Sequence, residues 1–90
     1  YTKLPFGNPD LAQARRRLEA NIEAYPNYLE TRVLLADDWA IVAGDRAVAE
    51  EQLRAVLAAD PAADPALEPE NRNAQRRAEA MLAAIDENFL

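Results

Sequence analysis

Two stretches decide the expected fold of this chain: residues 14–26, ARRRLEANIEAYP, and residues 49–61, AEEQLRAVLAADP. Each has alanine, leucine, an aliphatic residue and proline at intervals of four, and Ala14 and Ala49 are 35 residues apart. Alanine allows another helix to approach closely, the larger residues fill the contact, and proline ends a helix. The pattern predicts two equivalent helices separated by a helix of another kind.

The hydrophobic periodicity extends this pattern to four helices, at residues 9–25, 28–43, 45–59 and 69–88. The side chains expected to face inward are Leu11, Ala14, Leu18, Ile22 and Tyr25 in the first helix, Ala49, Leu53, Val56 and Leu57 in the third, and Ala74, Ala78, Met81, Leu82, Ile85 and Phe89 in the last. The second helix is apolar on more than one face, which predicts that it is covered from two sides. No segment alternates with the period of two that marks a strand.

Glycine and proline mark the expected boundaries between these helices. Gly44 is expected to end the second helix and Asp45 to cap the third. Residues 60–69, DPAADPALEP, predict a connector made of turns, and residues 5–10, PFGNPD, predict a turn that leads into the first helix.

The 35-residue offset indicates a tetratricopeptide (TPR) unit, whose usual period is about 34 residues. The helix at 28–43 fits the first half of a unit, with Leu35 and Ala36 in place of its Leu-Gly pair and Trp39 as its large aromatic. We therefore expect an all-α, TPR-like solenoid fragment of about four antiparallel helices. Residues 1–90 would form the C-terminal part of a domain whose N-terminal repeats are missing. A plain antiparallel bundle with coincidental prolines is the alternative.

Composition argues against several classes of function. The formal net charge of -6 disfavours nucleic acid and anionic membranes as partners. The chain has no cysteine, histidine or serine, so we expect no disulfide, no cofactor site and no metal site. Its hydroxyl groups belong to Thr2, Thr31 and the tyrosines, with no neutral-pH base beside them, so we expect no enzyme. No run approaches the length of a transmembrane segment.

The second helix supplies the candidate binding residues, because the first helix of a TPR unit lines the concave groove. Counted from Leu29, the groove positions are Glu30, Val33, Asp37, Ala40 and Ile41, and three of these five are apolar. An apolar groove suits a hydrophobic ligand, a partner helix or a subunit contact. We therefore predict that Val33, Asp37, Ala40 and Ile41 bind a ligand or partner. The alternative is that they pack against an upstream helix.

Other polar and aromatic residues have simpler interpretations than binding. Trp39 is expected in the core rather than stacked on a ligand. Asp37 and Asp38 are neighbours on a helix and point about 100° apart, so they favour solvent or an arginine over an acid–base pair. The arginines at 15–17 and at positions 72, 76 and 77 are interleaved with acids. This pattern favours surface ion pairs over an anion site.

Three long stretches resemble the C-terminal portion of the T-component family of tripartite ATP-independent periplasmic (TRAP) transporters, the TatT-like proteins. They are KLPFGNPDLAQARRRLE at residues 3–19, TRVLLADDWAIVAGDRAVAEEQLRAVLAADP at 31–61 and ENRNAQRRAEAMLAAIDENF at 70–89. The most telling parts are LPFGNP, the GDR turn and NRNAQRRAEAMLAAIDE. None of them is a catalytic signature.

The resemblance implies a periplasmic, TPR-like helical protein, often lipid-anchored through an N-terminus absent from this sequence. The founding member of the family forms a trimer and is thought to pair with the substrate-binding protein of its transporter. Related proteins are associated with hydrophobic ligands, including sterol-like lipids. The expected function is a non-enzymatic periplasmic transport accessory that binds a substrate-binding protein, a hydrophobic small molecule such as a lipid, or both. A generic TPR scaffold for protein–protein interaction is the alternative.

Overall fold

The computed structural model describes residues 9–89, and this part of the chain is helical and contains no strand. The elements in chain order are α1 (Pro9–Ala24), α2 (Glu30–Leu34), the π-helix η1 (Leu35–Ala40), α3 (Ile41–Ala43), α4 (Arg46–Ala58), the 3₁₀ helix η2 (Pro65–Leu67), α5 (Glu68–Ala83) and α6 (Ile85–Asn88). The turn expected at residues 5–8 lies outside the described residues.

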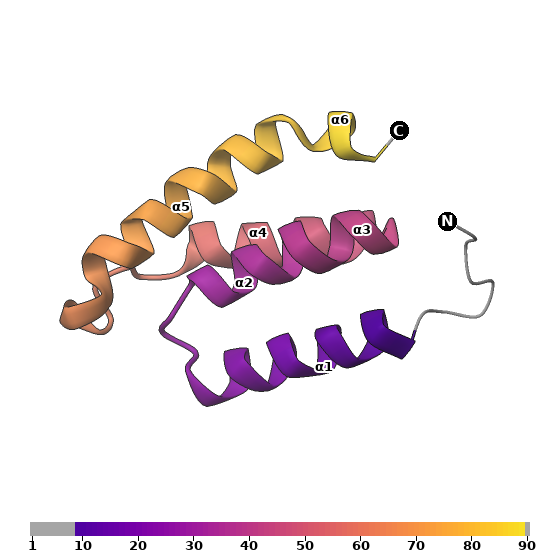
Figure 1. The fold of residues 1–90 in the computed structure, drawn as a ribbon. Helices are drawn as coiled ribbons and strands as arrows, with labels where there is room; N and C mark the ends of the chain where they lie inside the picture. The colour runs from indigo at the N-terminus through magenta and orange to yellow at the C-terminus, as the bar shows by residue number, and fades with distance from the viewer. Residues whose placement is uncertain (1–8, 90) are drawn as a thin grey trace.

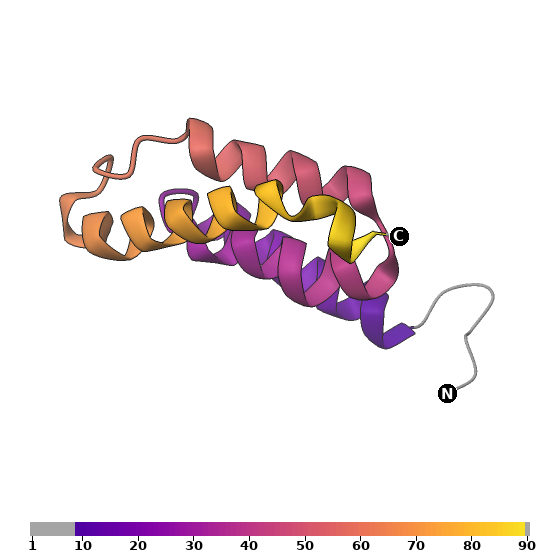
Figure 2. The ribbon, with the colours of Figure 1, turned by 90° about the horizontal axis from the view of Figure 1, so that it is seen from above.

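The rod formed by α2, η1 and α3 is the centre of the fold. It runs without a break between α1 on one side and α5 on the other, and α4 packs along it as its antiparallel neighbour (Figure 1). Seen from above, α4 and α5 lie side by side, with the rod beneath them (Figure 2). The second helix of the sequence is therefore covered from more than one side, as its apolar faces predict.

A two-residue link joins the rod to α4. Gly44 has a φ of +74°, the left-handed conformation that glycine adopts without strain. The Asp45 amide donates to the Ala40 carbonyl over 2.8 Å and the Gly44 amide to the Ile41 carbonyl over 3.2 Å, the pattern of a Schellman motif. The Asp45 carboxylate then accepts from the amide of Val48 and caps α4. Both predictions for this link are confirmed.

The core is formed mainly by the rod, α4 and α5. Its fully buried apolar members include Leu35, Leu53, Val56, Ala74 and Ala78. Trp39 is buried, as expected. Half-buried side chains of α1 and α6 pack around this centre: Leu11, Ala14, Leu18 and Ile22 from the first helix, and Ile85 near the end of the chain.

Several details differ from the sequence-based expectations. The helix at 28–43 contains a π-helical turn, and the helix expected at 69–88 begins at Glu68 and breaks at Ala84. Tyr25 and Leu57 were expected to face inward, but both are exposed. Tyr25 lies just beyond the end of α1, and Leu57 lies at the edge of an open depression between α4 and α5. The helices and the all-α class are as predicted, whereas the TPR solenoid remains a prediction.

Candidate functional site

The four residues predicted to bind a ligand or partner are not all at the surface. Val33 and Ala40 have no exposed surface and belong to the core. Asp37 and Ile41 are partly exposed. The expectation that Val33 and Ala40 face an open groove is therefore corrected. The helix α2, which carries Val33, packs against α1, α4 and α5, and η1, which carries Ala40, packs against α1 and α4. Whether any of the four contacts a ligand is still a prediction.

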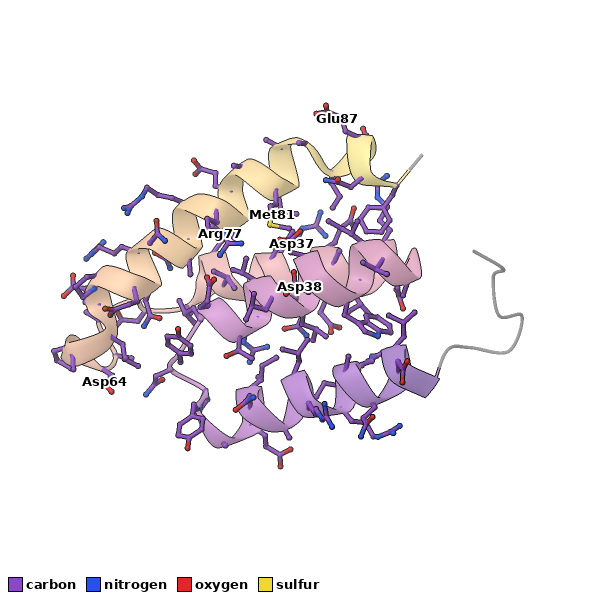
Figure 3. The ribbon with its side chains drawn as sticks, viewed as in Figure 1. Asp37, Asp38, Asp64, Arg77, Met81 and Glu87 are labelled. Carbon is purple, nitrogen blue, oxygen red and sulfur yellow. The ribbon has the colours of Figure 1, made fainter. Side chains whose placement is uncertain are left out.

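Asp37 lies in a charged cluster that joins the rod to α5. Arg77 pairs with Glu30, and its second terminal nitrogen lies 3.7 Å from a carboxylate oxygen of Asp37. In Figure 3, Arg77 and Met81 point from α5 toward the part of the rod that carries Asp37. Asp38 is exposed. This arrangement supports the expectation that Asp37 pairs with an arginine.

Trp39 connects the rod to α1. Its indole nitrogen donates a 2.7 Å hydrogen bond to the Leu11 carbonyl. The guanidinium carbon of Arg15 lies 4.7 Å from the centre of the indole ring, within reach of a cation–π interaction. These contacts occupy the ring, so Trp39 serves here as a core residue.

Among the described residues, three of the six arginines predicted to form surface ion pairs do so: Arg15, Arg72 and Arg77. Arg15 pairs with Glu19 over 3.2 Å and Arg72 with Glu68 over 2.6 Å, both within one helix. Arg46 pairs with Glu50 over 2.9 Å and reaches Asp86 over 2.6 Å, which connects α4 to α6. The hydrogen bonds to these two carboxylates, Glu50 first, raise the pKa of Arg46 above its ordinary value.

A shallow depression of about 270 Å³ lies between α4 and α5. It is lined by Leu57, Arg72, Gln75, Arg76 and Glu79. The amide nitrogen of Gln75 donates to the carbonyls of Val56 and Ala59, over 3.1 and 2.9 Å, and so holds the end of α4 against α5. The depression is open and its rim is charged, which makes it a poor enclosure for an apolar molecule.

Asn71 is fully buried, although the sequence-based reasoning did not identify it. Its carboxamide oxygen accepts from the Leu29 amide over 3.0 Å. Its nitrogen donates to the carbonyls of Asn27 over 2.7 Å and Pro61 over 3.2 Å. One side chain thus fastens the α1–α2 turn to the α4–α5 connector. Its burial could have been predicted from the sequence, because Asn71 precedes Ala74 by three residues and so lies on the same inward-facing side of α5.

The turn held by Asn71 displays two aromatic side chains. Tyr25 is 64% exposed and Tyr28 is 36% exposed. The turn and the beginning of α5 lie at the same end of the molecule in Figures 1 and 2. Figure 3 places Asp64 at this end as well. An exposed aromatic pair on a fixed backbone is typical of contact with another protein.

Within residues 9–89, none of the helices combines the length and hydropathy that crossing a membrane requires. The same residues contain no group of three acidic, histidine or cysteine side chains placed to hold a metal ion.

The fold and these surfaces define an all-helical protein whose candidate sites are outward-facing contact surfaces. A protein-family model described as "TRAP transporter T-component" matches residues 6–89. The chain therefore belongs to the TRAP transporter T-component family, and its membership implies a role as a transport accessory. This family consists of transporter components rather than enzymes. Searches of curated proteins and of solved structures gave no significant match.

Proposed function

We propose that this chain is a non-enzymatic periplasmic transport accessory that acts by binding the substrate-binding protein of a TRAP transporter. The observation that carries the proposal is the family match, since it covers almost all of the chain. A TRAP transporter works with a binding protein outside the cytoplasmic membrane, so an accessory that contacts this protein belongs in the same compartment. The trimer implied by the family resemblance is part of the proposal.

The described surface supports a protein as the principal ligand. Val33 and Ala40, expected to line an apolar groove, are fully buried. The depression between α4 and α5 is open and carries charged side chains on its rim. Exposed aromatic and charged side chains suit a protein interface better than a lipid-sized apolar molecule. A hydrophobic ligand remains the second candidate, because the apolar side chains of Ile41 in α3 and Met81 in α5 are both partly exposed.

The test is direct binding between the full-length protein and the TRAP substrate-binding protein of the same organism, measured by isothermal titration calorimetry. Saturable binding is expected, and an unrelated periplasmic binding protein is the control. Absence of binding would contradict the proposed partner. Organic extraction of the purified full-length protein, followed by mass spectrometry, examines the second candidate. A lipid present in stoichiometric amount would favour it.

Ile41 and Asp37 are the proposed contact residues of the rod. We expect Ile41→Asp to weaken binding of the substrate-binding protein or of an extracted lipid several-fold, because it places a charge in a partly apolar contact. Val42→Asp is the matched control, since Val42 is the next residue and is 66% exposed. Circular dichroism establishes that both variants fold. Equal binding by the two folded variants would remove Ile41 from the contact.

A further inference from the structure

We propose that the α1–α2 turn, residues 25–28, is the anchor that docks on the substrate-binding protein, in an apolar depression with a basic rim. The inference rests on the proposed function and adds a second contact surface to that of Ile41 and Asp37 on the rod. Aromatic side chains are enriched among the residues that contribute most to protein–protein binding. Tyr25 and Tyr28 are the exposed aromatic residues of the described chain, separated by Pro26 and Asn27.

The backbone of this turn is held in place before any partner arrives. The Tyr28 amide donates to the Tyr25 carbonyl over 3.0 Å. The buried Asn71 side chain holds the Asn27 carbonyl and the Leu29 amide, one on each side of Tyr28. Pro26 further restricts the chain. Because the turn is already ordered, little conformational entropy is lost when its tyrosines are buried on binding.

The charges around the turn indicate the kind of partner. Residues 18–31 and 55–71 contain acids and no lysine or arginine, and Asn71 brings these two segments together. Glu23, Asp60, Asp64 and Glu70 belong to this end of the molecule and form no ion pair among the described residues. A partner with lysine or arginine around an apolar depression complements this rim.

The same charges disfavour other occupants. A second copy of the chain meeting this end would bring a second set of acids against the first, and like charges in a contact cost binding free energy. An anionic membrane is repelled for the same reason. A basic-rimmed protein surface is therefore the occupant that fits.

The experiment compares full-length variants in calorimetric titrations with the TRAP substrate-binding protein. We expect Tyr25→Ala/Tyr28→Ala to weaken the affinity about tenfold or more. Val42→Ala is the control, because Val42 is about as exposed as Tyr25 and lies in α3, at the other end of the rod; the affinity of this variant should equal that of the wild type. Glu70→Lys should also weaken binding, by reversing a charge of the rim. Higher salt should lower the affinity of the wild type and change that of Glu70→Lys less.

The outcomes separate the inference from the proposed function. Wild-type protein that does not bind overturns both. Wild-type protein that binds, with a folded double tyrosine variant that binds equally well, overturns the inference alone. Self-association of the wild type that is lost in the variant would assign the turn to a second copy and overturn the proposed partner. Wild-type binding to phosphatidylglycerol vesicles that is lost in the variant would assign the turn to a membrane and likewise overturn the proposed partner. If the double variant does not fold, titrations of the single variants Tyr25→Ala and Glu70→Lys test the inference, and wild-type affinity in both would overturn it.

Discussion

A single buried amide, that of Asn71, connects three parts of the chain. Its side chain is fully buried and uses both its oxygen and its nitrogen in hydrogen bonds to backbone groups of the α1–α2 turn and the α4–α5 connector. Buried polar groups stabilise a fold when they are satisfied in this way, and they cost free energy when a partner is lost. Asn71 therefore determines how two connectors meet, while its apolar neighbours on α5 supply the packing.

Replacement of Asn71 by leucine should lower the free energy of unfolding by about 2–3 kcal/mol. The change leaves the buried Leu29 amide without its acceptor and frees two carbonyl oxygens. Urea unfolding followed by circular dichroism measures this loss. Asn73→Leu, on the exposed side of the same helix, is the control and should change stability by about 0.5 kcal/mol or less. Equal losses in the two variants would contradict the role assigned to Asn71.

Among the elements, α1 is held differently from α4 and α5. No side chain of residues 10–24 is fully buried, whereas α4 and α5 each contribute fully buried residues. The helix is fastened by a half-buried apolar stripe and by its contacts with Trp39. Elements with few buried contacts open at lower free energy than the rest of a protein. We therefore expect α1 to open before the remainder of the fold.

Leu18→Ala should weaken the docking of α1 by about 1–2 kcal/mol, because it removes part of the half-buried stripe. Amide hydrogen exchange should accelerate in α1 and stay nearly unchanged in α4. The emission of Trp39, the single tryptophan, should shift to longer wavelength as its ring meets water. Leu53→Ala, at a fully buried position of α4, is the control and should accelerate exchange throughout. Parallel acceleration in α1 and α4 of the Leu18 variant would contradict this order of opening.

At the scale of the whole molecule, α5 closes the fold over the rod. It packs against α4 and α2 and covers the part of α2 that would otherwise face outward. Arg77 joins α5 to the rod through Glu30 and Asp37, and Arg46 joins α4 to α6 through Asp86. Ion pairs between elements far apart in sequence fix their relative position, in contrast to the pairs within one helix.

Arg77→Gln should lower the free energy of unfolding by about 1 kcal/mol, because it removes a partly buried link between two elements. Arg72→Gln is the matched control: its pair with Glu68 lies within α5, and a loss of about 0.3–0.5 kcal/mol is expected. Thermal unfolding at low and high salt measures the difference, which should shrink at high salt. A larger loss for Arg72→Gln would overturn the role of Arg77.

Local patterns in the sequence were sufficient to predict the helices and the link between the rod and α4. These features depend on neighbours in the chain: apolar residues at helical spacing, a glycine free to adopt a positive φ, and an aspartate that caps the next helix. The family was also predicted from three sequence stretches that resemble it, and the family match over residues 6–89 confirms this prediction.

The faces of the helices that are covered depend on how the helices pack against one another. Val33 and Ala40 are buried, and Tyr25 and Leu57 are exposed, because of where α1, α4 and α5 pack. Helical periodicity predicts which residues share a face of a helix, but it does not predict which other helix covers that face. The π-helical turn in the rod and the three contacts of Asn71 also depend on segments distant in sequence. Contacts of this kind form only when the chain has folded, so local pattern could place Asn71 on a stripe but could not reveal the two connectors that it holds together.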